Sequence, residues 1–175
     1  AALRMQQGIR SPAAVEAAMA AGWDFMGHGW VQKPMHKVED QKSAIADTIR
    51  AIRDLTGRPP RGWESPGLTE TFDTIDLLAE AGIEYVADWV LDDQPCRIET
   101  AHGPVTSIPY TVEMNDIAMM ALQHHPSEEW LRRGIAQFER LYAEGEHGAR
   151  VMAVSIHPYI TGVPHPSGHL ENLHA

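Results

Sequence analysis

Short apolar runs alternate with amphipathic helical patterns along the chain, and this alternation limits the possible folds more than any other feature. An α/β domain with mostly parallel strands is the architecture that such alternation predicts. The expected helices cover residues 12–21, 38–56, 70–81 and 128–144, with Thr69 and Ser127 as caps of the last two. The expected strands cover residues 23–27, 62–65, 83–87, 105–110 and 151–156.

Apolar residues recur every three or four positions in the helical segments, and this spacing predicts which faces are buried. The longest helix carries its stripe at Ile45, Ile49, Ile52 and Leu55, and Gly57 is expected to end it. The predicted inward residues of the next two helices are Phe72, Ile75 and Ala79, then Leu131, Ile135, Phe138 and Leu141 or Tyr142.

The last apolar run, residues 151–156, is rich in β-branched residues and is typical of a strand buried on both faces. Pro158 cannot donate a ladder hydrogen bond, so the strand is expected to stop at His157. In α/β folds, the carboxyl ends of the strands line the active or ligand-binding site. A histidine there can transfer protons near neutral pH, although a lone histidine is more often a hydrogen-bonded core residue.

Polar and aromatic residues also follow the other expected strands. The five strand ends carry His28 and Trp30, Trp63 and Glu64, Asp88 and Trp89, Glu113 and Asn115, and His157 and Tyr159. Flat apolar walls with a few placed polar groups are what a concave site for a small polar ligand needs. The pattern therefore predicts such a site, although each residue taken singly is weak evidence.

Five motifs at these strand ends resemble the polysaccharide deacetylase (NodB-homology) superfamily, and most closely its allantoinase-like branch of cyclic-ureide hydrolases. The resemblance runs from about Pro12 to His165. Its motifs are Gly27-His-Gly-Trp30, Arg61-Gly-Trp-Glu-Ser-Pro-Gly-Leu-Thr-Glu-Thr71, Ala87-Asp-Trp89 with Asp92-Asp-Gln-Pro95, Ile108-Pro-Tyr-Thr-Val-Glu-Met-Asn-Asp116, and Ser155-Ile-His-Pro-Tyr-Ile-Thr-Gly-Val-Pro-His165.

The resemblance implies an irregular (β/α) barrel, present here as a single partial catalytic domain over residues 1–175. It would lack the first strand, which carries an aspartate pair in the family, and the family's C-terminal end. Nothing in residues 1–21 matches that aspartate pair.

The resemblance also implies roles for matching positions. His157 would protonate the departing amine, and Trp30, Trp63, Glu64, Pro66, Asp88, Trp89, Glu113 and Tyr159 would contact the substrate. His28 matches the first metal-binding histidine of the family. Gln32 stands where the second would be, and His36 is a weak substitute for it. The expected cofactor is therefore either none or one divalent metal, with zinc possible.

The composition of the chain argues against some classes of binding partner. A formal net charge of −10 argues against nucleic acid, because phosphates would be repelled. No run is long enough to predict a membrane span, and the single cysteine, Cys96, fits a reducing compartment. We therefore expect a cytoplasmic protein. A sheet that lacks its first strand has open edges, which favour pairing into a homo-oligomer.

Three functions remain open at this stage. The first is hydrolysis of a non-peptide carbon–nitrogen bond in a small cyclic amide or ureide, favoured by the loss of the second metal histidine. The second is zinc-dependent deacetylation of N-acetylated sugars, using His28, His36 and an aspartate outside this segment. The third is a non-catalytic barrel fragment that binds a ligand or a second copy of itself.

Overall fold

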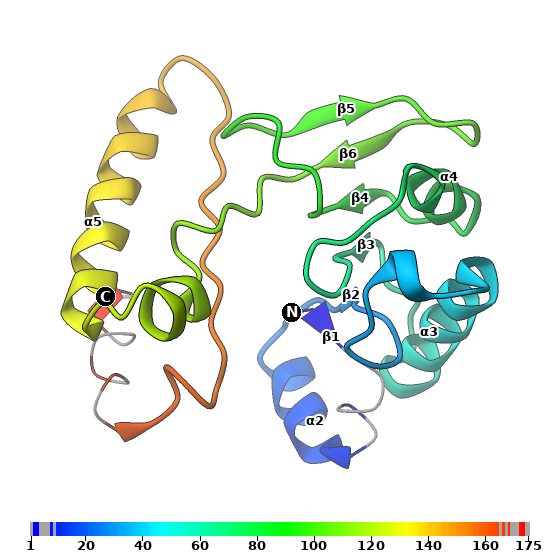
Figure 1. The fold of residues 1–175 in the computed structure, drawn as a ribbon, viewed down its shortest axis with the longest axis horizontal. Coiled ribbons are helices and arrows are strands. Elements are labelled where there is room, and N and C mark those ends of the chain that lie inside the picture. Colours follow the sequence, from blue (N-terminus) through cyan, green and yellow to red (C-terminus); the bar gives the residue numbers. More distant parts are fainter. Residues whose placement is uncertain are drawn as a thin grey trace. The chain divides into compact units, whose positions relative to one another are not determined.

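The computed structural model divides the chain into two compact units (Figure 1). The first comprises residues 1–89 and 96–108, and the second comprises residues 90–95 and 109–175. The structure describes residues 2–3, 8, 10–164, 166, 168, 172 and 173, with only the backbone of residues 2 and 3. His165, the last residue of the quoted motifs, lies outside the described residues. That the chain is a single domain stays a prediction.

A six-stranded sheet forms the centre of the first unit. Its spatial order is β1-β2-β3-β4-β6-β5, and every neighbouring pair is parallel except β5 and β6. The expectation of a mainly parallel α/β fold is confirmed, and over the described residues the sheet is open. The strands are β1 (Ala2–Leu3), β2 (Met26–Gly27), β3 (Gly62–Trp63), β4 (Tyr85–Val86), β5 (Cys96–Ile98) and β6 (Val105–Ser107).

The strands differ from the predicted ones in length and number. Four of the five predicted segments pair over only two or three residues each, and Trp23 lies outside β2 with 52% of its surface exposed. The strand β5, which holds Cys96, was missed because its segment contains turn-forming residues. β1 precedes the first strand that we expected. Since Asp24 is the first aspartate of the sequence, β1 carries no aspartate pair.

Three helices accompany this sheet: α2 (Pro12–Ala20), α3 (Gln41–Thr56) and α4 (Phe72–Glu80), with a short 3-10 turn, η1 (Met35–Lys37). α3 follows its prediction closely. The Asp40 side chain accepts a hydrogen bond from the Ser43 N–H at 3.0 Å, and Gly57 ends the helix in the left-handed conformation. Ile45 and Ile52 are fully buried, which confirms the predicted stripe.

The start of α4 and one residue of its inner face, Phe72, were predicted wrongly, whereas Ile75 and Ala79 pack against the core as predicted. Thr71, not Thr69, caps the helix, because the Thr71 and Thr74 side chains form a reciprocal capping box. Phe72, at the first helical position, is 86% exposed and stacks on Trp89 instead of entering the core. Thr69 accepts a hydrogen bond from the Met35 N–H at 3.0 Å and so ties two loops together.

Trp63 is the central side chain of the core of the first unit. It is fully buried and packs with a cluster of other buried hydrophobic residues of this unit. A Cβ on Gly27, in the neighbouring strand, would lie 2.3 Å from its indole. Gly27 therefore leaves the space that the indole fills. The buried members of this cluster are Met35, Ile45, Trp63, Leu78, Ile83, Val86 and Val105.

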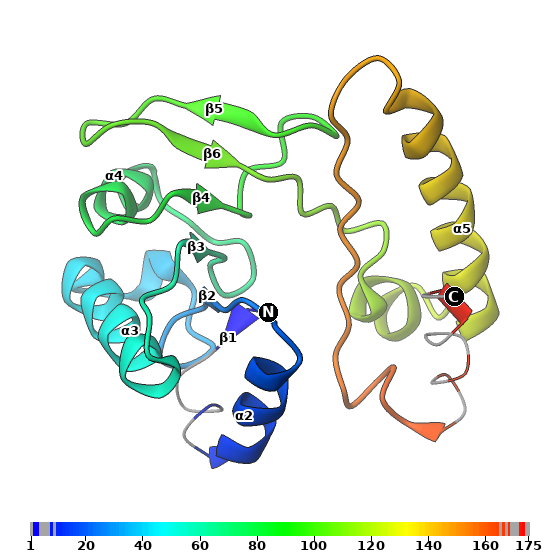
Figure 2. The same ribbon diagram turned by 180° about the vertical axis from the view of Figure 1, so that it is seen from behind.

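The second unit is built from one π-type helical turn, η2 (Ile117–Leu122), the helix α5 (Ser127–Glu144) and an extended segment (Figure 2). Its core comprises Met114, Met119 and Trp130. α5 buries Trp130, Gly134 and Leu141. Ile135, Phe138 and Tyr142, which we predicted to face inward, are 45%, 56% and 75% exposed. The apolar residues of α5 cover a wider part of the helix surface than the face that packs against the core. The prediction therefore assigned exposed apolar residues to the buried face.

The predicted strand at residues 151–156 is extended but almost unpaired. Its one bridge joins Ser155 to Asn115 in the parallel direction. Val154 and Ile156 are 37% and 39% exposed, so the expectation of burial on both faces is wrong. The β-branched residues favoured extension, but the backbone hydrogen bonds of this segment reach only Asp93, at its start, and the Met114–Asp116 segment among the described residues.

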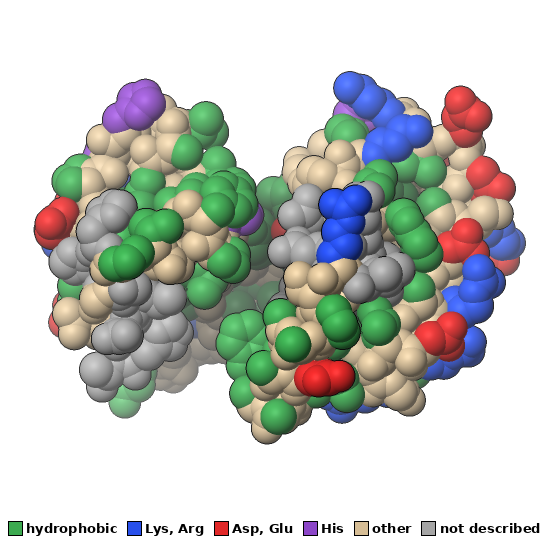
Figure 3. All heavy atoms as spheres, turned by 90° about the horizontal axis from the view of Figure 1, so that it is seen from below, with side chains coloured by type: hydrophobic (Ala, Val, Ile, Leu, Met, Phe, Trp, Pro, Cys, Tyr) green, Lys and Arg blue, Asp and Glu red, His purple; other side chains and the backbone are tan. Residues whose placement is uncertain are grey.

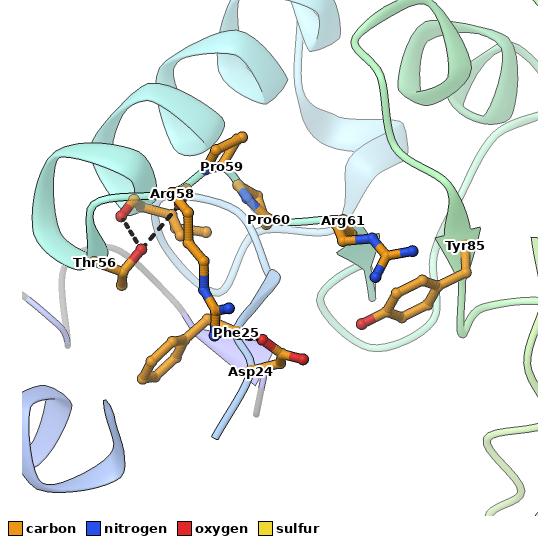
Figure 4. A pocket seen from close by; sticks show the side chains of 9 residues that line it. Asp24, Phe25, Thr56, Arg58, Pro59, Pro60, Arg61 and Tyr85 are labelled. Carbon is orange, nitrogen blue, oxygen red and sulfur yellow. Dashed lines mark hydrogen bonds and ion pairs between the residues drawn. The ribbon is translucent and has the colours of Figure 1, made fainter. Parts of the chain in front are cut away.

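A small hollow of about 100 Å³ lies at the amino ends of β2, β3 and β4 (Figure 4). Arg58 pairs with Asp24 at 2.6 Å beside it, and Arg61 pairs with Glu84. The guanidinium groups are therefore already neutralised by carboxylates. This end of the sheet contributes to holding the strands together, whereas the opposite end carries the residues considered next.

The surface of the first unit mixes both signs of charge. Figure 3 shows acidic and basic side chains interleaved on the side that carries α3. None of the helices in the described part of the chain is long and apolar enough to cross a membrane.

Candidate functional site

Polar side chains cross-link the carboxyl ends of β2, β3 and β4. The Nδ1 atom of His28, directly after β2, lies 2.7 Å from the backbone carbonyl oxygen of Glu64, directly after β3. A carbonyl only accepts, so Nδ1 of His28 carries the proton. The N–H of Ser65 lies 2.9 Å from both carboxylate oxygens of Asp88, which follows β4. The predicted gathering of strand-end residues is present across these three strands.

Three carboxyl groups share the interior at this edge. Burial, and next the charge of Asp88, raise the pKa of Glu64 to about 7. The same two causes raise the pKa of Glu70 to about 9. Burial also raises the pKa of Asp88, to about 6, against the opposing hydrogen bond from Ser65. At neutral pH, Glu70 holds a proton beside ionised Asp88, and Glu64 titrates near neutrality.

Glu70 belongs to this group although we did not select it from the sequence. Its Oε2 atom accepts a hydrogen bond from the indole N–H of Trp89. Its Oε1 atom is buried, with no hydrogen-bond partner among the described residues. Glu70 lies in the loop between β3 and α4, seven residues past the strand end, so a search limited to strand ends misses it. Its position inside the quoted motif was the available signal.

The predicted aromatic walls divide into different environments. Trp63 is fully buried and its indole N–H donates to the Ser65 hydroxyl at 3.0 Å, so the structure places it in the core and not on a ligand wall. Trp89 is half-buried between Phe72 and Glu70. Trp30 is 45% exposed. Pro66 is buried and lies close to Gly29, in the loop that follows His28.

The residues expected to hold a metal do not form a ligand set. Among the described residues, no three His, Cys, Asp or Glu side chains are gathered as metal ligands would be. His36 lies exposed on η1, and Gln32 is exposed in the loop before it. His28 has Glu64 as its carboxylate neighbour, with Nδ1 and Oε1 3.9 Å apart. The donors present therefore do not fit the three-ligand site that a catalytic zinc ion needs.

The second unit holds a histidine fixed by a buried carboxylate. Asp116 is fully buried, and its Oδ1 atom accepts a hydrogen bond from Nδ1 of His157 at 2.6 Å. Its Oδ2 atom accepts from the His157 backbone N–H at 2.6 Å and from the Thr161 hydroxyl at 3.2 Å. The imidazole side chain is 31% exposed. The carboxylate selects the tautomer with the proton on Nδ1 and fixes the orientation of the ring, so Nε2 is the ring nitrogen left to contact a ligand.

Asp116 was quoted in a motif but not selected, because its pairing with His157 spans 41 residues. Glu113, three residues earlier, was the acid that we selected from the sequence. Glu113 is exposed, and the structure brings it to none of the groups described above. Tyr159 is 66% exposed, and its ring lies 5.6 Å from that of His157, centroid to centroid. Asn115 instead caps η2 by accepting from the Ile117 N–H at 2.9 Å.

The architecture and these side chains define a class: a mainly parallel α/β protein with acid–base groups at its strand ends. Residues 4–86 match the family model of polysaccharide deacetylases. Together with the structural neighbours below, this match shows that the chain is similar to the polysaccharide deacetylase (NodB-homology) superfamily.

Solved structures share the fold over nearly the whole chain. PuuE allantoinase matches with a TM-score of 0.87 and 24% identity, covering 97% of this chain and 58% of its own. A probable polysaccharide deacetylase from Pseudomonas aeruginosa PAO1 matches at 0.86 and 26%, covering 98% and 60%. A family 4 carbohydrate esterase from Streptomyces lividans, solved in complex with acetate, matches at 0.59 and 14%, covering 99% and 69%.

The chain thus spans about three fifths of the length of the first two structures. The comparison with curated proteins gives no match.

Proposed function

We propose that the protein hydrolyses a non-peptide carbon–nitrogen bond in a small cyclic amide or ureide. The observation that carries this proposal is the Asp116–His157 pair, with Nδ1 and Oδ1 2.6 Å apart. An amide nitrogen is a poor leaving group until it is protonated. A histidine held in one tautomer by a buried carboxylate, with its ring partly exposed, can supply that proton from Nε2.

The carboxyl groups of the first unit support acid–base chemistry in this protein. A carboxyl with a pKa of about 7, such as Glu64, can accept or release a proton at neutral pH. In the first unit, Trp30 and Trp89 offer partly exposed ring faces, which suit a flat substrate. In the second unit, Tyr159 offers an exposed ring beside His157. The donor set around His28 supports a reaction with weak or absent dependence on a metal, because backbone and side-chain donors can replace part of a Lewis acid's role.

The resemblance to the allantoinase-like branch supports a cyclic ureide as the substrate. PuuE allantoinase and a probable polysaccharide deacetylase match equally well, with TM-scores of 0.87 and 0.86, but the strand-end motifs of this chain have the order that the allantoinase-like branch shows. These points favour ring opening over removal of an acetyl group.

The two substrate classes give different products, and this difference provides the test. Ring opening of a cyclic ureide adds water and releases no small acid, whereas deacetylation releases acetate. The intact protein should consume a cyclic ureide from a panel that also holds hydantoins, lactams and N-acetylglucosamine oligomers, with no acetate formed. Release of acetate from the oligomers, with the cyclic amides untouched, would overturn the proposal in favour of a deacetylase.

A further inference from the structure

The helix α5 presents two apolar faces, and its own unit covers only one of them. Trp130, Gly134 and Leu141 are buried. The second face, which we call the outer stripe, comprises Leu131, Ile135, Phe138 and Tyr142. Three of its four members are among the exposed large hydrophobic residues, and Leu131 is half-buried.

The outer stripe has the spacing of a helix–helix seam. Its members are separated by four, three and four positions, which aligns them along one side of an α-helix and matches the repeat of paired helices. The rings of Phe138 and Tyr142 stack with centroids 5.8 Å apart, so they present one continuous apolar surface. A row of large apolar side chains of this kind on a surface helix is typical of an interaction site.

Two opposite charges border the stripe on the same edge. Arg132 directly follows Leu131, and Glu139 directly follows Phe138, so both occupy equivalent positions seven residues apart. Arg132 pairs with Glu129 at 2.7 Å, but its side chain is 68% exposed. Nε and one Nη of Arg132 donate to the two carboxylate oxygens of Glu129, and its other Nη can donate to a second carboxylate. No ion pair within the described part of the chain involves Glu139.

These charges match a second copy of the same helix in the antiparallel direction. When Ile135 faces Phe138 of the second copy, Leu131 faces Tyr142 of that copy. The same register brings Arg132 beside Glu139 of the second copy, and the twofold axis repeats the contact. A parallel pair would instead place the charged edge against the edge of Gly134 and Leu141, which carries no charge.

We propose that the outer stripe is an interface on which a second copy of this chain docks, with the two α5 helices antiparallel across a twofold axis. The apolar seam supplies the association, and the Arg132–Glu139 contacts select the direction. The homo-oligomer expected from the sequence is thus assigned to α5 and not to the edges of the sheet.

The first test is the mass of the chain in solution by sedimentation equilibrium at about 10–100 µM, the range in which moderate interfaces associate. The expected mass is twice the 19.4 kDa of one chain. Phe138→Glu should give the mass of one chain with an unchanged circular dichroism spectrum. Ala136→Glu, at an exposed position of α5 away from the stripe, is the matched control and should leave the mass doubled. A single-chain mass for the unmodified protein, or a doubled mass for Phe138→Glu, would overturn the proposal.

The second test addresses the direction of pairing. Arg132→Glu and Glu139→Arg should each raise the dissociation constant about tenfold, because like charges then meet twice across the axis. The double variant restores opposite charges and should return the constant to near its original value. Additive weakening in the double variant would contradict the antiparallel arrangement.

Discussion

The pairing of Asp116 with His157 explains how a half-exposed imidazole is held ready for proton transfer. Asp116→Asn keeps the size of the side chain, but its amide can donate to Nδ1 of His157 and so select the other tautomer. We expect kcat to fall by roughly 10²–10⁴-fold, the usual contribution of general acid–base catalysis, with KM changed much less. Steady-state kinetics across pH checks this. If Asp116 positions His157, the pH dependence of kcat should also shift along the pH axis in the variant. A curve of the same shape and position, with only a lower kcat, would contradict this role.

The buried carboxyl groups of the first unit make its stability depend on pH. The pKa values of Glu64, Glu70 and Asp88 are raised in the folded chain to about 7, 9 and 6. Their stabilising contribution is therefore present at pH values below about 4, where both states are protonated, and is lost as pH rises towards 9. The free energy of unfolding should decline over that window.

Glu70→Gln removes the carboxyl group with the largest pKa shift of the three and keeps an oxygen that can accept from the Trp89 indole N–H. The variant should be more stable than the unmodified chain at pH 9 by on the order of 1–3 kcal/mol, and close to it at pH 5. Urea unfolding at both pH values measures this difference. Glu16→Gln, on the exposed side of α2, is the control. An identical pH slope for Glu70→Gln and the unmodified chain would show that Glu70 does not hold the proton.

At the scale of elements, the close contact of β2 and β3 depends on glycine. Gly27→Ala would place a Cβ 2.3 Å from the buried Trp63 indole, which must then shift. Overpacking of this kind typically costs about 1–3 kcal/mol. Gly57→Ala, which meets no neighbour but has a positive φ of 81°, should cost about 1 kcal/mol. Denaturant titration compares the two variants, and a smaller loss for Gly27→Ala would contradict the packing argument.

Elements that carry their own local signals could be predicted from the sequence. The helical spacing of Ile45 and Ile52, together with Gly57, predicts α3. Its N-terminal cap, Asp40, was identified only in the structure. The alternation of apolar and amphipathic segments predicts the parallel sheet. The orientation of α5 could not be predicted, because its apolar arc exceeds the face that packs and tertiary contacts decide between the parts. The segment at residues 151–156 has strand-like residues, but pairing depends on partners far along the chain.

The candidate site was predictable to the same degree. His28 and Glu64 directly follow strands, and Asp88 lies two residues past β4, so parallel pairing alone brings them to one edge. Glu70 lies in a loop, and Asp116 precedes a helical turn. Their contacts depend on how loops fold back, which no local pattern encodes.

For the whole molecule, we predict that activity depends only weakly on a bound metal ion. His28 lacks a gathered set of partner ligands among the described residues. Elemental analysis of the purified intact protein should therefore find well below one equivalent of zinc, unchanged in His28→Ala. About one equivalent, lost in that variant, would show that other residues complete the ligand set and would favour the zinc deacetylase.

The central claim is that His157 delivers a proton to the departing nitrogen of an amide. The most direct measurement is turnover of the cyclic ureide by the intact protein carrying His157→Ala, compared with the unmodified protein. We predict a loss of at least about 10²-fold in kcat with an unchanged circular dichroism spectrum. Unchanged turnover in a folded His157→Ala variant would contradict the claim.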